Sequence, residues 1–287
     1  MSRLVIAGLG YSGSAVARAA VAAGWAVQGT VRNPARAAAP PGVGVVRFDE
    51  AGSAIVAATH LLVTAAPGEA GDPVLAAHEA VIRAAPGLRW VGYLSTTGVY
   101  GDRGGAEVDE ATPPAPGQPR SQRRLEAERQ WEAAAGYALD IFRTGGIYGP
   151  GRSAFDDLRE GTARRTLKPG HLFGRIHRDD IALAVLAAMR QERPPGPRVL
   201  HLVDDEPAES AAVVEEAARL LGLAPPPAVA FEQALPGLSP MARSFWAENR
   251  RVANAVTKSA LGIAWRYPSY REGLRAILAE ERGQGPA

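Results

Sequence analysis

A short glycine-rich segment near the start of the chain most strongly limits the folds that it can adopt. The apolar run Arg3–Ala7 leads directly into Gly8-Leu9-Gly10-Tyr11-Ser12-Gly13, and the residues from Ser12 to Ala23 are small and favour a helix. Glycines at these positions allow a tight turn after a buried strand, a close approach of the backbone to a pyrophosphate, and tight packing of the helix on a sheet. The segment therefore predicts a phosphate site at the start of that helix, where backbone N–H groups lack internal partners.

Apolar and helix-forming segments continue to alternate after this loop. Further strands are expected at 26–31, 43–48, 60–64, 90–95 and 138–143, with alanine-rich helices near 51–58 and 72–85 and a charged helix over 121–135. Strands that alternate with helices form a parallel sheet with right-handed crossovers. The predicted fold class is therefore α/β: a Rossmann-type doubly wound parallel sheet with a small C-terminal substrate lobe.

The pattern becomes irregular after Gly145, where prolines and glycines are frequent, although a helix is expected at 179–190 and a strand at 199–203. Asp179 and Asp180 are expected to cap that helix. Residues 1–150 should form the dinucleotide-binding core, and residues 176–205 should return to it. The segments 151–175 and 206–287 should form the lobe, over the carboxyl ends of the strands where ligands bind in such sheets.

The end of the second expected strand bears on the choice of cofactor. Sites for NAD usually carry a carboxylate there for the ribose 2′-hydroxyl, but this strand ends in Arg32, and Arg36 follows. Because an arginine donates charge-assisted hydrogen bonds to a 2′-phosphate, we expect NADP rather than NAD. The alternative is that both arginines are solvated loop residues. Four further residues are expected at the cofactor, namely Asp49 at the adenine amine and Ala65, Ala66 and Pro67 on the ribose side.

Composition argues against several other classes of protein. The 287 residues include no cysteine, which removes thiolate metal sites and cysteine nucleophiles, and His171, His177 and His201 lack ligand partners at metal spacing, so no metal is expected. The net charge is only +2, and acidic residues interleave with the arginines, so no basic stripe for nucleic acid is evident. No apolar run is long enough to span a bilayer and no signal peptide is evident, which predicts a cytoplasmic protein.

Four later segments carry a family resemblance. They are Leu94–Gly101 (LSTTGVYG), Arg143–Gly151 (RTGGIYGPG), Ile176–Asp180 (IHRDD) and His201–Pro207 (HLVDDEP). With the glycine loop, they resemble in order and spacing the extended short-chain dehydrogenase/reductase superfamily, in its NAD-dependent epimerase/dehydratase group, over most of the chain. The resemblance implies that Thr96 binds the reacting oxygen of the substrate. It also implies that Ser95 lies at the cofactor, and that four residues face the substrate: Thr97, Gly146, Tyr148 and His177.

The chain departs from that superfamily at its proton-transfer pair, a tyrosine with a lysine four residues later. Aligning Glu128 with the glutamate that follows the lysine places Arg124 at the lysine position and Arg120 at the tyrosine position. A guanidinium cannot act as a base, but Arg124 can donate to the nicotinamide ribose, and Arg120 can stabilise an oxyanion or hold a phosphate or carboxylate. The alternative is that both lie on a solvated helix face. Tyr100 carries the nearest hydroxyl that could transfer the proton instead. Because the tyrosine and lysine pair is missing, the chain resembles the atypical subgroup of the superfamily.

Two functions are compatible with these residues. The first is an NADP-dependent oxidoreductase or epimerase-like enzyme that acts on a small polar substrate such as a nucleotide sugar. The second is a non-catalytic NADP-binding sensor or regulatory protein that has lost the tyrosine and lysine pair. The retained substrate-side motifs favour the enzyme. Neither nucleic acid nor a membrane is expected as a partner, and the formation of a homodimer is left open.

Overall fold

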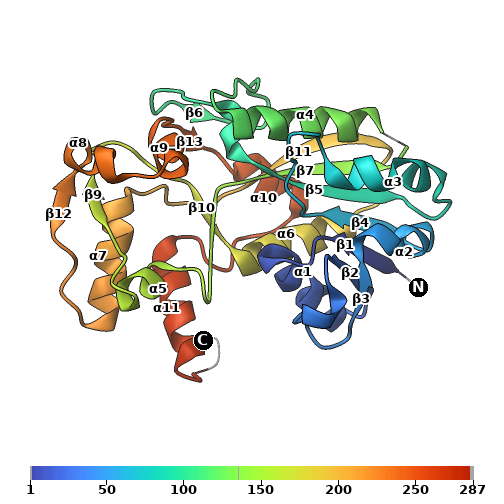
Figure 1. Ribbon diagram of the computed structural model, residues 1–287, viewed down its shortest axis with the longest axis horizontal. Coiled ribbons are helices and arrows are strands. Elements are labelled where there is room, and N and C mark those ends of the chain that lie inside the picture. Colours follow the sequence, from blue (N-terminus) through green and yellow to red (C-terminus); the bar gives the residue numbers. More distant parts are fainter. Residues whose placement is uncertain (1, 135, 285–287) are drawn as a thin grey trace.

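The structure is a computed structural model that describes residues 2–134 and 136–284. At its centre lies a sheet of seven parallel strands in the order β11-β7-β5-β4-β1-β2-β3 (Figure 1). The strands are β1 (Arg3–Ala7), β2 (Ala26–Val31), β3 (Val43–Arg47), β4 (His60–Val63), β5 (Trp90–Thr96), β7 (Ala138–Thr144) and β11 (Gly196–Leu202). The Rossmann-type fold class predicted from the sequence is confirmed, and each strand lies within three residues of its predicted bounds.

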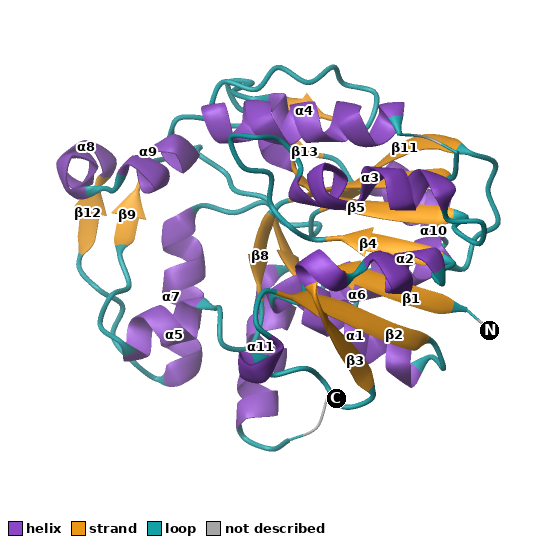
Figure 2. Ribbon diagram, turned by 45° about the vertical axis from the view of Figure 1, so that its right-hand side comes forward, coloured by secondary structure: helices purple, strands orange, loops and turns teal. Residues whose placement is uncertain are grey.

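Strand β1 is the point at which the strand order changes direction. It pairs with β2 on one side, Ile6 opposite Gly29, and with β4 on the other, Ala7 opposite Val63. The chain builds β1, β2 and β3 outward to one edge and then crosses back to place the other four strands beyond β1 (Figure 2). At such a switch point the loops that follow neighbouring strands diverge, which leaves a crevice for a ligand at the carboxyl edge.

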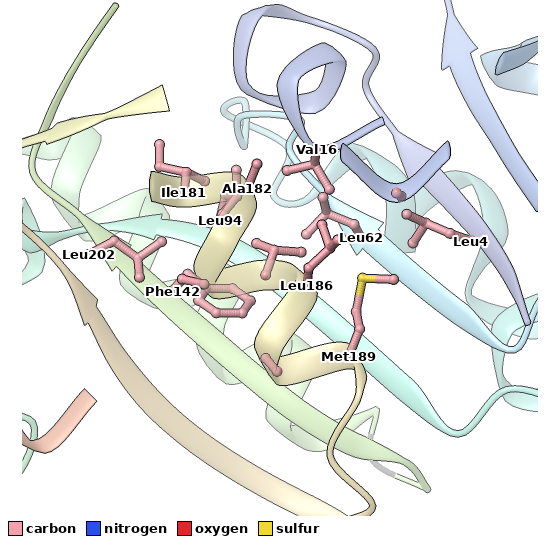
Figure 3. Packing of buried hydrophobic residues seen from close by; sticks show 14 of the residues in the cluster. Leu4, Val16, Leu62, Leu94, Phe142, Ile181, Ala182, Leu186, Met189 and Leu202 are labelled. Atoms are coloured by element: carbon pink, nitrogen blue, oxygen red, sulfur yellow. The ribbon is translucent and has the colours of Figure 1, made fainter. Parts of the chain in front are cut away.

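Helices cover both faces of the sheet, because its apolar strands are buried on both sides. On one face α1 (Tyr11–Ala22) packs against α6 (Arg178–Met189), and the other face carries α2 (Gly52–Val56), α3 (Pro73–Ala84) and α4 (Pro119–Ala133). Figure 3 shows the first face, where Leu62 and Phe142 of the sheet lie near Val16 of α1 and Leu186 of α6.

A second group of elements lies beyond the carboxyl edge of the sheet, at the left of Figure 1. Its core surrounds Phe155, Leu274 and Ile277, contributed by α5 (Ala154–Arg159) and α11 (Tyr270–Glu281), with α7 (Ser210–Leu221) packed alongside. Strands β9 (Arg165–Leu167) and β12 (Ala228–Ala230) pair beside α8 (Phe231–Ala234) and α9 (Pro240–Trp246). Two short parallel pairs complete the structure: β8 (Gly146–Tyr148) with β10 (Arg175–His177), and β6 (Glu107–Val108) with β13 (Arg251–Val252).

Several local expectations differ from the structure. Helix α10 (Ala255–Leu261) contacts β11 and α6, and Leu261 and Trp265 join the core beneath the sheet, although the sequence assigned this stretch to the lobe. Helix α4 begins at Pro119 rather than Ser121, because proline suits the first helical position. Helix α6 is capped by His177 rather than by an aspartate. None of the helices within 2–134 and 136–284 has both the length and the apolarity needed to cross a membrane.

Candidate functional site

Two hollows lie along the carboxyl edge of the sheet. We call the first the glycine-loop cleft; it has a volume of about 740 Å³ and is lined by residues that follow β1, β2 and β4, namely Gly8, Leu9, Gly10, Thr30, Val31, Arg32, Phe48, Thr64, Ala65, Ala66 and Pro73. We call the second the lobe cavity; it has a volume of about 310 Å³. Its walls come from the ends of β5 and β7, the start of α4, and two lobe segments, 172–175 and 244–252.

The geometry of the glycine loop fits a bound pyrophosphate. Gly8 has a φ of 111°, and a Cβ atom there would lie 2.6 Å from Oγ1 of Thr64, so only glycine fits. A Cβ atom on Gly13 would collide with the carbonyl oxygen of Gly8. Nothing lies within 4 Å of the Cβ position of Gly10, so the cleft is open there. The backbone N–H of Gly8 donates to Thr30 Oγ1 at 3.0 Å, which fixes the loop to β2.

The side chain of Tyr11 lies away from the cleft, although the sequence placed it in the phosphate loop. Its hydroxyl donates to the carbonyl oxygen of Pro150 at 3.1 Å, and its ring lies 5.3 Å from the guanidinium of Arg178. Ser12 is buried and does not line the cleft. A phosphate would therefore meet the backbone N–H groups of the first turn of α1, which have no partners within the helix.

The predicted adenine and ribose contacts divide into two groups. Arg32, Ala65 and Ala66 line the cleft, whereas Pro67 does not. Asp49 does not line the cleft either, because its carboxylate accepts a 2.7 Å hydrogen bond from Arg47 and its side chain is 63% exposed. Phe48 reaches the cleft in its place, so this wall is apolar rather than acidic.

The end of β5 supplies the floor of the lobe cavity. Thr96 and Thr97, which the sequence predicts to face the substrate, line this cavity, and Thr96 Oγ1 accepts a hydrogen bond from the backbone of Gly98 at 3.1 Å. Gly146 lines the same cavity. Ser95 points the other way: its hydroxyl donates to the buried carboxylate of Glu128, so its side chain is not available to a cofactor.

The two arginines at the tyrosine and lysine positions have different surroundings. Arg124 donates to the carbonyl oxygen of Leu94 at 2.7 Å and to the hydroxyl of Tyr93 at 3.2 Å, which holds it against the end of β5. Arg120 lines the lobe cavity, and its guanidinium lies 4.5 Å above the ring of Phe245. Arg124 therefore does not have the purely solvated environment that was the alternative for this helix face, whereas Arg120 is an exposed residue.

Tyr100 is not at the site, which corrects the expectation that it transfers a proton. It is fully buried, and its hydroxyl interacts with Arg143 at 2.7 Å and with His201 at 2.5 Å. Burial raises the pKa of its phenol, which makes the hydroxyl harder to ionise. The residue is part of a buried polar network that joins β7 to β11.

Tyr148 and His177 are also buried rather than turned towards the lobe cavity. The hydroxyl of Tyr148 donates to the carbonyl oxygen of Ser269 at 3.3 Å, and the rings of Tyr148 and His177 lie 5.2 Å apart. His177 is enclosed between Tyr148 and Tyr267, and burial lowers its pKa to about 4. Asp180, expected to cap α6, instead accepts hydrogen bonds from the backbones of Arg266 and Tyr267. These residues attach the lobe to the sheet.

Comparison with known proteins identifies relatives of this chain. No protein-family model matches the chain. A relative from Escherichia coli strain K12, protein YeeZ, is 30% identical over 246 residues, which cover 79% of this chain and 86% of YeeZ. A 3-diazoavenalumate denitrifying reductase from a Streptomyces species is 32% identical over 186 residues, and the match spans 58% of each chain.

Solved structures extend the likeness to the whole chain. A conserved protein of unknown function from Silicibacter pomeroyi DSS is 44% identical, with a TM-score of 0.89 over 98% of this chain and 99% of that one. A putative NAD-dependent epimerase/dehydratase from Methylobacillus flagellatus is 25% identical, with a TM-score of 0.72 over 98% and 99%. The chain belongs to the extended short-chain dehydrogenase/reductase superfamily, as an atypical member. MoeE5, solved with UDP-glucuronic acid and NAD, has the same fold at 21% identity, with a TM-score of 0.79 over 98% and 100%.

The walls of the lobe cavity carry few of the side chains that exchange protons near neutral pH. No tyrosine, lysine or histidine is among the described residues that line it. Among the lining residues that the sequence did not predict are Arg175, Phe245, Trp246, Glu248 and Arg250. They come from short elements and loops, β10, α9 and the segment after α9, where neither hydrophobic periodicity nor motif spacing indicates which side chains turn inward. Arginine was too frequent in the chain to single out Arg175 or Arg250.

Asp204 is buried close to Arg175 of the cavity wall, and its charge gives a pH-dependent prediction. Neither of its carboxyl oxygens has a hydrogen-bond partner among the described residues, and burial raises its pKa to about 8 despite the nearby charge of Arg175. An unfolded aspartate titrates near pH 4, so folding favours the protonated acid, and stability falls as the pH rises from about 4 to about 8. The neutral variant Asp204→Asn avoids this loss.

We expect Asp204→Asn to be more stable than the parent by roughly 2–5 kcal/mol at pH 8, with a difference that shrinks towards pH 4 and levels off above pH 8. Thermal unfolding of both proteins between pH 4 and pH 9 measures this. Asp205→Asn is the neighbouring control, because the Asp205 carboxylate is 41% exposed and pairs with Lys258 of α10 at 2.7 Å. A stability difference that stays constant with pH would contradict the assignment of a raised pKa to Asp204.

Proposed function

We propose that this chain is an NADP-dependent oxidoreductase whose small polar substrate binds in the lobe cavity beside Thr96. The observation that carries the proposal is the presence of two hollows on one edge of the sheet, an open glycine loop after β1 and a cavity floored by the ends of β5 and β7. Bound in the glycine-loop cleft, NADP would supply or remove a hydride at its nicotinamide ring.

Arg32 supports NADP over NAD. It lines the cleft, and its guanidinium makes no hydrogen bond or ion pair with any described residue, so it can donate to a 2′-phosphate. No acidic residue is among the described residues that line the cleft, so nothing there would repel the phosphate. The α1 N-terminus would hold the pyrophosphate through backbone N–H groups.

In the lobe cavity, the side chains near Thr96 would orient the substrate rather than transfer a proton to or from it. The hydroxyl of Thr96 can donate to or accept from a reacting oxygen. In the superfamily, a lysine at the position of Arg124 acts with a tyrosine four residues before it. Here Arg120 takes the place of that tyrosine, and Arg124 contributes its positive charge at the end of β5. With no tyrosine, lysine or histidine among the described residues of the cavity wall, the proton that a carbonyl reduction consumes would come from water.

The similar proteins are compatible with this role. One relative is named a reductase, and one structural neighbour was solved with UDP-glucuronic acid and NAD. We therefore include both simple carbonyl compounds and nucleotide sugars among the substrates to be tested.

A second candidate function, an NADP-responsive sensor without catalysis, is favoured by the absent tyrosine and lysine pair. To distinguish the two candidate functions, the protein is incubated with NADPH deuterated at nicotinamide C4 and with a panel of carbonyl compounds and nucleotide sugars. Deuterium found at one carbon of a product supports the oxidoreductase. Tight NADPH binding without transfer to any compound of the panel supports the sensor.

Cofactor choice gives the first mutational prediction. Replacing Arg32 with alanine removes the charge-assisted hydrogen bonds to the 2′-phosphate, which are worth about 1.5–3 kcal/mol each. We expect NADPH to bind about 10–100-fold more weakly, with little change for NADH, when both are titrated by quenching of tryptophan fluorescence.

Arg36→Ala is the matched control, because Arg36 is exposed in the same loop but does not line the cleft. If the parent bound NADH as tightly as NADPH, and Arg32→Ala bound both as the parent does, the cofactor would not be NADP.

A further inference from the structure

The charges on the wall of the lobe cavity are unbalanced. Three arginines line it, Arg120, Arg175 and Arg250, against one acidic residue, Glu248, which leaves two positive charges in excess. Like charges gathered around one small cavity repel one another, and an anionic ligand would compensate them. Arg120 is an exposed residue, so a ligand can reach its guanidinium from solvent. The cavity is therefore built to receive negative charge.

Two of the three arginines are already committed to the protein. Arg250 pairs with Glu248 at 3.0 Å and donates to the carbonyl oxygen of Gly101 at 2.8 Å. Arg175 donates to the carbonyl oxygens of Phe173 and Ala208, at 2.9 and 3.0 Å. These bonds hold each guanidinium in place and use part of its donor set.

Arg120 is the third arginine of the cavity wall, and it is not bonded to the protein in this way. Its guanidinium makes no hydrogen bond or ion pair with any described residue, and its one close contact is the face of Phe245, 4.5 Å from the ring centre. Burial, followed by the charge of Arg124, lowers the pKa of Arg120, and the charge of Glu248 opposes that shift. A planar guanidinium with free N–H groups binds a planar carboxylate through two parallel hydrogen bonds.

An aromatic wall stands next to Arg120. Phe245 lines the cavity and is 48% exposed as a residue, and the adjacent Trp246 also lines it. The indole of Trp246 is held by rings on several sides, with centroids 5.1 Å from Phe173, 5.3 Å from His171 and 5.3 Å from Phe231. A flat surface fixed in this way loses little entropy when a planar ring stacks on it.

The size of the cavity narrows the ligand further. Its volume of about 310 Å³ is at the small end of the range for ligand sites, roughly 300–1,000 Å³. That space suits one ring with one anionic group better than the base, two sugars and diphosphate of a nucleotide sugar. A carboxylate needs one guanidinium with free N–H groups, and Arg120 is the one arginine of the described wall that makes no hydrogen bond within the protein.

We propose that the lobe cavity binds a small planar-ring carboxylate, with its carboxylate on Arg120 and its ring against Phe245 and Trp246. This inference rests on the proposed function, since it names the substrate class of the same site. The reacting group of the substrate would then lie on the side of the ring that faces Thr96.

The test uses the full chain saturated with NADP⁺ and isothermal titration with four probes: cinnamate, its neutral amide cinnamamide, phenyl phosphate and UDP-glucose. We expect cinnamate to bind at least about 10-fold more tightly than each of the others, because only it combines the ring with a planar anion. Arg120→Gln should weaken cinnamate binding by about 10–100-fold and leave cinnamamide unchanged. Arg123→Ala is the matched control, because Arg123 lies on the same helix but does not line the cavity.

The NADPH affinity of each variant is measured in parallel, which separates this inference from the proposed function. Absence of NADPH binding to the parent would overturn the proposed function itself. Normal NADPH binding with cinnamamide, phenyl phosphate or UDP-glucose bound as tightly as cinnamate would overturn only the substrate class. Retention of cinnamate affinity in Arg120→Gln would remove Arg120 as the anion site.

Discussion

Replacing Gly10 with aspartate is expected to abolish NADPH binding while leaving the protein folded. No atom lies within 4 Å of the Cβ position of Gly10, so the new side chain fits without a clash, but it enters the space that the pyrophosphate needs. Its carboxylate would also accept from the N–H groups at the start of α1 and would repel the phosphates. Loss of two or more charge-assisted hydrogen bonds predicts a decrease in NADPH affinity of at least about 100-fold.

Fluorescence titration with NADPH measures this loss, and circular dichroism with thermal unfolding checks the fold. Gly68→Asp is the matched control, because Gly68 also has open space at its Cβ position, lies in the loop after β4 and does not line the cleft. An affinity of Gly10→Asp within a few-fold of the parent value would mean that the dinucleotide binds elsewhere.

The part of the site that the sequence predicted well is the part fixed by local backbone geometry. Gly8, Gly10 and Gly13 are predicted because a strand, a tight turn and a helix start within a few residues. Gly8 has a positive φ and Gly13 packs on the carbonyl oxygen of Gly8, whereas Gly10 leaves the space in front of the loop open. The central strands are predicted for a similar reason: β1, β4, β5 and β7 are buried on both faces, so their residues form nearly continuous apolar runs. Arg32 followed from its place at the end of β2.

The residues that were wrong depend on contacts between distant segments. The resemblance placed Ser95 at the cofactor, but its hydroxyl meets Glu128, 33 residues away. Tyr100 was considered for proton transfer, but it interacts with His201, 101 residues away. A polar side chain near a motif can turn towards the site or towards the interior, and the sequence alone does not distinguish the two. The same limit applies to Phe245 and Trp246, whose places depend on how the lobe folds over the sheet.

The buried network also explains how the site keeps its shape without the tyrosine and lysine pair. Ser95 on β5 donates to Glu128 on α4, and Glu128 pairs with Arg143 on β7. Arg143 also contacts the hydroxyl of Tyr100, which in turn contacts His201 on β11. Thr96, next to Ser95, therefore sits on a strand end that is held from both sides. We infer that this network, rather than the proton-transfer pair, positions the floor of the lobe cavity.

The largest expected loss of stability comes from breaking this network at Glu128. Its carboxylate pairs with Arg143 at 2.7 Å, and the Arg143 and Glu128 side chains are only 6% and 2% exposed. Replacing Glu128 with alanine leaves the Arg143 charge buried without its partner, which costs about 3–5 kcal/mol. For a chain of this size that loss lowers the Tm by roughly 10 °C, which thermal unfolding followed by circular dichroism will measure.

Two controls distinguish the free energy cost of the unpaired Arg143 charge from the cost of the lost Glu128 contacts. Glu126→Ala removes one half of an exposed pair with Arg129, 3.8 Å apart on the same helix, and should change the free energy of unfolding by less than about 0.5 kcal/mol. The double variant Glu128→Ala with Arg143→Met carries no unpaired charge and should recover part of the loss. If it were less stable than Glu128→Ala alone, the destabilisation would come from lost packing and hydrogen bonds rather than from the buried charge of Arg143.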